Sequence, residues 1–323
     1  MRILDWASLG EAGRAAALRR PAASGSSGLR RKVAAIVADV RRRGDEAVRA
    51  LTKRHDGAAL KSLSVTAAEK RAALRVVSPA DLAAMKEAVR RVAAFHRFQM
   101  PRPYTTEIGE GILCRRRFVP IQRVGLYVPG GSAPLPSTVI MLGVPARIAG
   151  CPVKVLATPP RRDGSIDPHI LAAAELVGIA DVFKMGGAQA IAALAYGTRT
   201  VPKTDKIFGP GNPWVTEAKI QVAADPDGAA CDFPAGPSEV LVIADSSADP
   251  GFVAADLLAQ AEHGPDSQVL LLSDSPALLR AAAAELERQL PLLPRAAIAR
   301  AALAKSRLIR VREVGQALAL SNR

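Results

Sequence analysis

The chain has 323 residues and carries 44 lysines and arginines against 30 aspartates and glutamates, which gives a formal net charge of +14. Its length predicts two domains. No apolar run reaches the roughly 18 residues that a membrane span needs, so a transmembrane protein is excluded. Aromatic residues make up only 4% of the chain, which leaves few platforms for stacking.

The positive charge is concentrated in the first third of the chain. Residues 1–117 carry 25 basic and 11 acidic side chains, whereas the remainder carries 19 of each. Such a segment could neutralise nucleic-acid phosphates. Its arginines, however, alternate with apolar positions at helical spacing and with acidic residues, which favours a solvent-exposed helical face. We therefore expect no nucleic-acid partner, and a nucleic-acid-associated protein stays as an alternative.

The N-terminus and the cysteines indicate the compartment. The first twenty residues alternate apolar and charged side chains and lack the continuous apolar stretch of a signal peptide. Cys114, Cys151 and Cys231 are far apart, odd in number and without a C-x-x-C spacing. We expect three buried free thiols in a reducing environment. The sequence thus predicts a cytoplasmic protein without a membrane partner.

The first segment, residues 1–117, is predicted as an N-terminal arm followed by a helical region. Between residues 29 and 98, apolar side chains recur at three- and four-residue steps with arginines on the other face. Ser78 is expected to cap a helix that begins at Pro79. A stretch of small residues, 22–28, is expected to link the arm to the helices.

The second segment, residues 118–235, alternates short apolar strands with helices. Strands are expected at residues 123–128, 153–157, 181–184 and 206–208, and helices at residues 138–148, 169–177, 189–196 and 214–223. Four β-α units in a row predict a parallel sheet that is covered by helices on both faces. This segment is therefore expected to form a first Rossmann-like α/β domain.

The third segment, residues 236–323, follows a joint rich in proline, glycine and aspartate. Strands are expected at residues 239–244, 268–272 and 308–311, and helices at residues 252–262, 276–290 and 314–320. The last helix runs almost to the end of the chain without a cap. We expect a second α/β domain that is incomplete at its C-terminus.

Three glycine-containing loops follow predicted strands. They are residues 128–132 (VPGGS), 185–189 (MGGAQ) and 208–212 (FGPGN). Parallel sheets bind ligands at the carboxyl ends of their strands, where glycine allows the backbone to approach a phosphate. None of the loops is a G-x-G-x-x-G or a Walker A sequence. They predict a phosphate-binding edge, and the alternative is that tight turns need these glycines for structural reasons alone.

A second group of polar residues lies in residues 260–264 (QAEHG). Spacing of three places Gln260 and His263 on one helical face near the end of a helix, so an amide oxygen and an imidazole could share a metal ion. The alternative is a solvent-exposed helix end. The chain has only 4 histidines, which excludes a histidine-rich metal site.

Other polar side chains give weaker signals. Ser238 precedes a strand and could bind a ligand or cap a turn, and no G-x-S-x-G elbow surrounds it, which argues against a hydrolase nucleophile. Glu217 and Lys219 lie on a predicted helix. We expect them to form a solvent-facing pair rather than an acid-base couple.

Five blocks of the sequence, taken together, resemble histidinol dehydrogenases and occur in the order of that family. They are residues 124–131 (VGLYVPGG), 185–191 (MGGAQAI), 209–212 (GPGN), 232–239 (DFPAGPSE) and 260–268 (QAEHGPDSQ). The resemblance implies an NAD-dependent, zinc-requiring oxidoreductase of histidine biosynthesis that oxidises L-histidinol through L-histidinal to L-histidine. It also implies an aldehyde-dehydrogenase-like fold with two Rossmann-like parallel-sheet domains, and a homodimer.

The resemblance also assigns roles to individual positions. Those that match are Tyr127, Gln189 and Asn212 for NAD, Ser238 for substrate, and Gln260 and His263 for both zinc and substrate. The family's general base and two further zinc ligands are expected beyond Arg323, so no catalytic base is expected within this chain. The resemblance therefore implies that the 323 residues alone are inactive or nearly so. A non-catalytic protein that binds a nucleotide or an imidazole is the remaining alternative.

Overall fold

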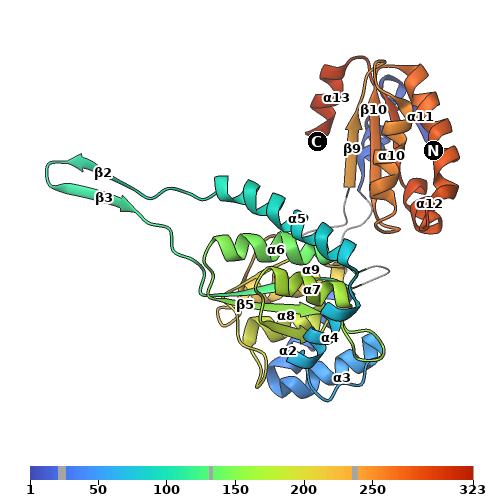
Figure 1. Ribbon diagram of the computed structural model, residues 1–323. Helices are drawn as coiled ribbons and strands as arrows, with labels where there is room; N and C mark the ends of the chain where they lie inside the picture. Colours follow the sequence, from blue (N-terminus) through green and yellow to red (C-terminus); the bar gives the residue numbers. More distant parts are fainter. Residues whose placement is uncertain (21–26, 131–133, 235–238, 323) are drawn as a thin grey trace. The chain divides into compact units, whose positions relative to one another are not determined.

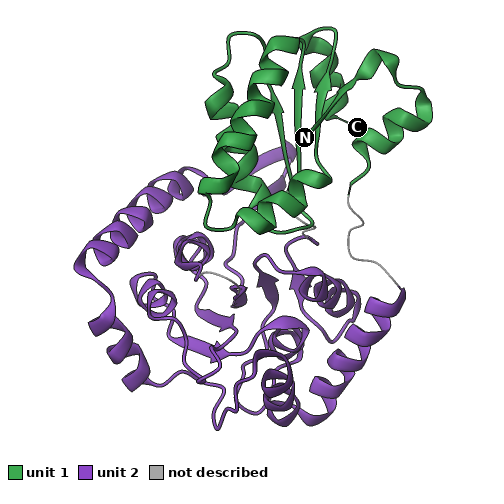
Figure 2. Ribbon diagram, turned by 90° about the vertical axis from the view of Figure 1, so that its right-hand side faces the viewer, with its two compact units in different colours: residues 1–23, 236–323 green, residues 24–235 purple. Residues whose placement is uncertain are grey.

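The computed structural model describes residues 1–20, 27–130, 134–234 and 239–322, and it divides into two compact units (Figures 1 and 2). Unit 1 comprises Met1–Ala23 and Gly236–Arg323, and unit 2 comprises Ser24–Ala235. The division after residue 235 coincides with the expected boundary between the two α/β segments. The N-terminal residues, however, belong with the C-terminal part of the chain, whereas the sequence placed them with the helical region.

Unit 2 is built on a parallel sheet with the strand order β6-β5-β4-β7-β8. Its strands are β4 (Arg123–Tyr127), β5 (Val153–Thr158), β6 (Asp181–Lys184), β7 (Lys206–Phe208) and β8 (Ala230–Cys231). The chain adds β5 and β6 on one side of β4 and then places β7 and β8 on the other side. In open parallel sheets, the crevice at such a reversal is the usual position of a ligand.

Helices cover both faces of this sheet, as the β-α pattern predicts. One face packs against α4 (Ala67–Val76), α5 (Pro79–Phe98), α6 (Pro136–Ile148) and α7 (Pro168–Leu176). The other packs against α2 (Ser27–Arg43), α3 (Asp45–Asp56), α8 (Gly187–Tyr196) and α9 (Pro213–Ala224). The helical region expected before residue 98 therefore contributes to the two cores of the sheet.

Local signals explain where these helices begin. Ser78 caps α5 as predicted, because its side chain accepts a hydrogen bond from the N–H of Asp81 at 3.0 Å and Pro79 occupies the first helical position. Thr66 and Glu69 form a reciprocal capping box at the start of α4. The apolar residues spaced by three and four then place one face of each helix on the sheet.

A β-hairpin extends from unit 2 and was not expected from the sequence (Figure 1). Strands β2 (Tyr104–Gly109) and β3 (Ile112–Arg116) pair antiparallel, and every residue of both strands is exposed. Gly111 supplies a φ of +71° at the turn. The alternation of side chains in this segment is weak, and the segment follows two prolines, so the pattern gave no clear strand signal.

Unit 1 has a smaller parallel sheet in the order β1-β11-β10-β9. Its strands are β1 (Arg2–Asp5), β9 (Glu239–Ile243), β10 (Gln268–Ser273) and β11 (Arg307–Arg310). Strand β1 is an edge strand of four residues, too short for its alternation to be recognised. It joins this unit because it pairs along β11, and because Trp6 after it is buried against Ile309 and Leu320.

The helices of unit 1 lie on both faces of that sheet. Helices α10 (Pro250–Ala261), α11 (Pro276–Gln289) and α12 (Ala296–Ala304) share one core with the sheet. Helices α1 (Glu11–Leu18) and α13 (Val314–Ser321) share the other. Short 3-10 turns occur at Trp6–Ser8 and Leu290–Leu292. None of the helices in the described ranges is long and apolar enough to cross a membrane.

Candidate functional site

The loops that follow β4, β5 and β6 meet at Pro159, on the carboxyl edge of the unit 2 sheet. A Cβ atom added to Gly130 would lie 2.4 Å from Pro159 Cγ, and one added to Gly186 would lie 2.6 Å from Pro159 Cβ. Any side chain at either position would have to displace the proline. Glycine is therefore needed at both positions for packing, which is the structural explanation that the sequence left open.

A cavity of about 530 Å³ opens between the loops that follow β4 and β5. Its walls include Pro129, Gly130, Pro159 and Arg162, and Asp56 contributes from the end of α3. Small-molecule sites typically measure roughly 300–1,000 Å³ and combine apolar walls with a few polar groups. The cavity thus has the size and the composition of a ligand site.

Tyr127 and Gln189 are brought together around Gly187. The Tyr127 hydroxyl accepts a hydrogen bond from the N–H of Gly187 at 3.1 Å, and burial raises the pKa of this phenol to about 12. At neutral pH the hydroxyl is therefore protonated and can donate one hydrogen bond. Gln189 lies in the first turn of α8 and is 3% exposed, and its Oε1 lies 2.9 Å from where a Gly187 Cβ would be.

Asn212 lies on the neighbouring loop, after β7. It caps α9, because its Oδ1 accepts hydrogen bonds from the N–H groups of Trp214 at 3.0 Å and Val215 at 3.1 Å. On the same loop, Gly209 has a φ of +127°, and a Cβ there would lie 2.1 Å from the Tyr127 carbonyl oxygen. The loops after β4 and β7 are therefore in contact at the reversal of strand order, and the three positions expected for NAD lie along one edge of one sheet.

A buried ion pair supports the loop that carries Asn212. Lys219 is 3% exposed, and its Nζ donates to the Gly209 carbonyl oxygen at 2.6 Å and pairs with Asp232. The Asp232 Oδ2 accepts from the N–H of Gly209 at 2.9 Å. Glu217 is buried too and lies 3.7 Å from Arg30 of α2. The expectation of a solvent-facing Glu217–Lys219 pair is wrong. Both side chains are buried: Lys219 contacts the Gly209 loop, and Glu217 lies beside Arg30.

Unit 1 places Gln260 and His263 at the end of α10. Gln260 Nε2 is buried and has no hydrogen-bond partner among the described residues, while His263 lies beyond the helix in the following turn and is exposed. The N–H of His263 donates to the Gln260 carbonyl oxygen at 3.2 Å, which keeps the two residues in one turn. Among the described residues, no group of three or more His, Cys, Asp or Glu side chains could hold a metal ion. Ser238 lies outside the described residues.

The three cysteines are free, but only part of the expectation about them is correct. Cys151 is buried, Cys231 is half-buried and Cys114 is exposed on β3. Burial raises the pKa of the Cys151 thiol and raises that of Cys231 to about 11. The prediction that all three are buried is wrong for Cys114, because it lies in the exposed hairpin.

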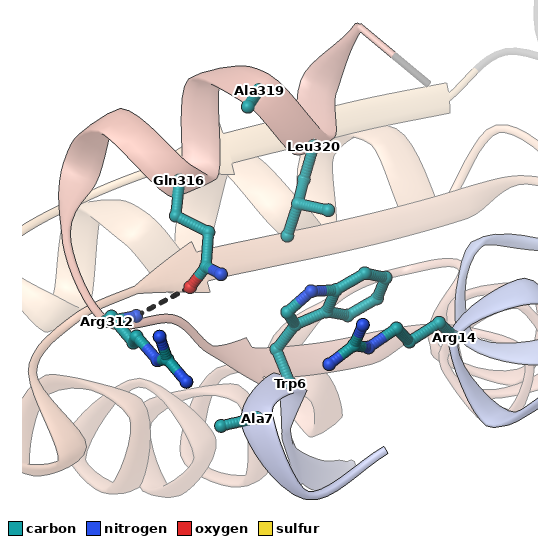
Figure 3. A pocket seen from close by; sticks show the side chains of 7 residues that line it. All are labelled: Trp6, Ala7, Arg14, Arg312, Gln316, Ala319 and Leu320. Atoms are coloured by element: carbon teal, nitrogen blue, oxygen red, sulfur yellow. Dashed lines mark hydrogen bonds between the residues drawn. The ribbon is translucent and has the colours of Figure 1, made fainter. Parts of the chain in front are cut away.

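Unit 1 also contains a cavity of about 350 Å³ whose lining includes Trp6, Arg14 and Gln316 (Figure 3). The Arg14 guanidinium carbon lies 5.4 Å from the centre of the Trp6 ring, and Arg14 Nε is buried with no hydrogen-bond partner in the part of the chain that the structure describes. On the other side, the Gln316 amide oxygen accepts from the backbone N–H of Arg312 at 2.8 Å. The cavity therefore places positive charge beside an indole ring.

Two residues of the unit 2 edge were not singled out from the sequence for this site. Lys219 was assigned to the helix surface, and Asp56 had no motif around it. Neither could be recognised from local pattern, because Lys219 contacts a loop and Asp56 lines a cavity formed by segments far away in the chain. The one available signal for Asp56 is its position: it ends a helix whose last turn is otherwise basic.

Together, the fold and the loops define an α/β protein in which glycine-containing loops meet at a strand-order reversal. The family model described as histidinol dehydrogenase matches residues 19–323. The histidinol dehydrogenase of Xanthomonas euvesicatoria pv. vesicatoria (strain 85-10) is 59% identical over 323 residues, which are 100% of this chain and 75% of that protein. The chain therefore belongs to the histidinol dehydrogenase family, a family of oxidoreductases that act on histidinol in histidine biosynthesis.

Further relatives agree. The histidinol dehydrogenase of Xylella fastidiosa (strain 9a5c) is 56% identical over the same 323 residues, which are 75% of that protein. The crystal structure of histidinol dehydrogenase from Elizabethkingia anophelis matches with a TM-score of 0.92 and 44% identity, over 99% of this chain and 72% of that one. The chain spans about three quarters of the length of these relatives, and the α/β fold expected from the sequence is confirmed.

Proposed function

We propose that the protein uses NAD, with zinc, to oxidise L-histidinol through L-histidinal to L-histidine. Membership of the family supports the substrate and the reaction class. The observation that supports NAD as the cofactor is the contact at the unit 2 edge, where the backbone of Tyr127 approaches the Gly209 loop at the reversal of strand order. Ligands of open parallel sheets bind at such positions.

The residues of that edge fit a dinucleotide. Glycines at positions 130, 186 and 209 leave no Cβ at the places where the loops pack most closely. Among the described residues, nothing accepts the Tyr127 hydroxyl proton or engages the Asn212 amide nitrogen, because the recorded bonds of these side chains are to the Tyr127 oxygen and the Asn212 Oδ1. Tyr127, Gln189 and Asn212 would hold NAD, whose nicotinamide accepts a hydride when bound.

The end of α10 fits part of a zinc site. The Gln260 amide can turn either of its atoms outward because Nε2 has no partner, and the imidazole of His263 is exposed. Zinc, when bound, supplies Lewis-acid character and holds a substrate in place. Two protein donors bind zinc more weakly than a full set of three or four. We propose Gln260 and His263 as zinc and substrate ligands, with Ser238 as a further substrate contact.

The exposed hairpin supports a homodimer. Ile108, Ile112 and Leu113 are 65%, 56% and 67% exposed, and an isolated two-stranded hairpin is at best marginally stable in water. A second copy of the chain would cover these side chains. A Leu113→Asp variant should shift a dimer towards monomer in sedimentation experiments. A wild-type chain that sediments as a monomer at high concentration would contradict the dimer.

The cytoplasmic location and the lack of nucleic-acid and membrane partners remain part of the proposal. Several arginines of the basic first third are paired with carboxylates, which supports a structural use of that charge. Such pairs are Arg41 with Asp225, Arg43 with Asp39 and Arg90 with Glu87. Binding to nucleic acid at low salt would contradict this part.

Calorimetric titration with NAD tests the function most directly. The chain should bind NAD, and Tyr127→Phe should weaken binding about tenfold, because one hydrogen bond to the ligand is lost. Tyr104→Phe, on the exposed hairpin, is the matched control and should bind like wild type. The absence of NAD binding by the wild-type chain would overturn the proposal.

A further inference from the structure

The cavity of unit 1 lies at the carboxyl edge of the unit 1 sheet. Trp6 directly follows β1, and Arg312 and Gln316 follow β11, so its walls come from segments near both ends of the chain. Because the four strands are parallel, these residues lie at the edge where open sheets bind ligands. Gln260 and His263 belong instead to the segment that enters β10, at the amino edge. The volume of about 350 Å³ is that of a small-molecule site.

The polar side chains that line this cavity present hydrogen-bond donors. The Gln316 Oε1 accepts from the backbone N–H of Arg312 at 2.8 Å. A backbone nitrogen can only donate, so the amide oxygen must face it and the amide nitrogen must face away. In Figure 3 that nitrogen lies on the side of Trp6. Guanidinium and indole nitrogens donate as well, and no acidic side chain of the described ranges lines the cavity. Such a lining suits a ligand that accepts.

The arginine donors are not satisfied by the protein itself. Arg14 Nε is buried without an acceptor among the described residues, and its guanidinium lies over the Trp6 ring instead of against a carboxylate. Neither Arg14 nor Arg312 forms an ion pair within the described parts of the chain, and Asp5, which precedes Trp6, pairs with Arg310. A buried charged donor without an acceptor lowers stability, so an anion that supplies acceptors is favoured.

The arrangement of the donors favours a phosphate group. Arg14 and Arg312 lie on either side of Trp6 (Figure 3). A phosphate ester offers three acceptor oxygens and a charge of about −1.5 to −2, whereas a carboxylate has two oxygens and a single charge. Two guanidinium groups on different sides therefore match the phosphate better. Ala319 and Leu320 add an apolar wall, which leaves room for the organic part of an ester.

We propose that the unit 1 cavity binds a phosphate group, free or carried by a small ester, through the guanidinium groups of Arg14 and Arg312 and the amide nitrogen of Gln316, with the Trp6 indole N–H as a further donor. The bound group joins α1 to the segment between β11 and α13. A ligand that binds only the folded chain raises its thermal stability. This inference does not depend on the proposed use of NAD.

The test uses Trp6 as its reporter. The chain has 2 tryptophans, so a Trp214→Phe background leaves Trp6 as the single indole. Titration with inorganic phosphate and with glycerol 3-phosphate should give a saturable change in its fluorescence and raise the melting temperature. Arg312→Ala should weaken binding at least about tenfold, because a charged donor is lost. Arg280→Ala is the matched control, since it removes the same charge from the exposed side of α11, on the other face of the sheet.

A second variant keeps the test independent of folding. Gln316→Glu retains an oxygen to accept from the Arg312 N–H and replaces the amide donor with a negative charge. Phosphate binding should be lost, while the melting temperature without phosphate should stay that of the background.

The outcomes decide both the site and its ligand. Equal binding of the two probes identifies the free phosphate as sufficient, and tighter binding of glycerol 3-phosphate shows that the ester occupies the rest of the cavity; both support the proposal. Acetate or succinate that binds as tightly as phosphate would overturn the phosphate assignment. No saturable response at millimolar phosphate, or unchanged affinity in both Arg312→Ala and Gln316→Glu, would overturn the site.

Discussion

The candidate residues of unit 2 and those of unit 1 are held in different ways. Tyr127 and Gln189 are each 3% exposed, and the loops beside them are packed to the limit that glycine allows. Gln260 and His263 lie at a helix end, one with an unpartnered amide nitrogen and the other exposed. The unit 2 edge is therefore arranged by the protein's own contacts, whereas the contacts of the described residues leave polar groups at the end of α10 unengaged.

This difference determines what substitutions should do. Where a site is part of the packed interior, a substitution should reduce both stability and binding. Where it consists of exposed donors, a substitution should reduce binding alone. Each prediction that follows tests one side of this comparison.

The largest effect is expected for Gly209→Ala. The new Cβ would lie 2.1 Å from the Tyr127 carbonyl oxygen, and the φ of +127° is one that alanine rarely adopts. We expect a loss of about 4 kcal/mol of stability in urea unfolding followed by circular dichroism, together with loss of NAD binding. Gly109→Ala is the control, because Gly109 has no positive φ and a Cβ there makes only ordinary contacts. Equal stability of the two variants would show that the edge can relax.

Lys219→Met should have the next largest effect. It leaves Asp232 without its cation, and breaking a buried ion pair on one side costs about 3 kcal/mol. The double variant Lys219→Met with Asp232→Asn should recover part of that loss, because no unpaired charge remains. Lys32→Met, on the exposed face of α2, serves as the control. A Lys219→Met variant as stable as this control would show that the pair does not support the Gly209 loop.

Asp56→Asn should stabilise the chain, and by an amount that depends on pH. Burial raises the pKa of Asp56 in the folded state, so wild-type stability falls as pH rises from the unfolded to the folded pKa. The variant should therefore match wild type below about pH 4 and exceed it at neutral pH by about 1 kcal/mol, a modest gain because the carboxyl is only partly buried. Urea unfolding at several pH values measures this, and a constant difference between the two proteins would contradict it.

The sequence predicted the repeating parts of the fold well. Strands at residues 181–184 and 206–208 match β6 and β7, because short apolar runs between turn residues and helical periods form a local pattern. The grouping of β1 with β11 could not be predicted, since pairing across more than 300 residues leaves no local trace. The exposed hairpin was missed for the opposite reason, because a strand pair without a buried face lacks regular alternation.

In unit 2, the candidate site was predictable only where glycines marked it. The three loops were located by glycine after strands, but the reasons differ between positions: Pro159 excludes a side chain at Gly130 and Gly186, and the Tyr127 carbonyl excludes one at Gly209. Lys219 was misassigned, since a lysine on a helix carries no sign of burial until the loop it contacts is known. Pairwise contacts between distant segments are therefore what the sequence did not show.

The smallest effect on stability, and the clearest test of the contrast, is expected for His263→Ala. His263 is exposed and only its backbone N–H is engaged, so unfolding free energy should change by no more than about 0.5 kcal/mol. Zinc affinity measured by equilibrium dialysis should nevertheless fall by at least about tenfold, since one of two proposed protein donors is removed. His96→Ala, at a half-buried histidine of α5, should leave zinc binding unchanged. If His263→Ala instead lowered stability as much as the unit 2 variants do, the end of α10 would be part of the packed interior and the contrast between the units would be lost.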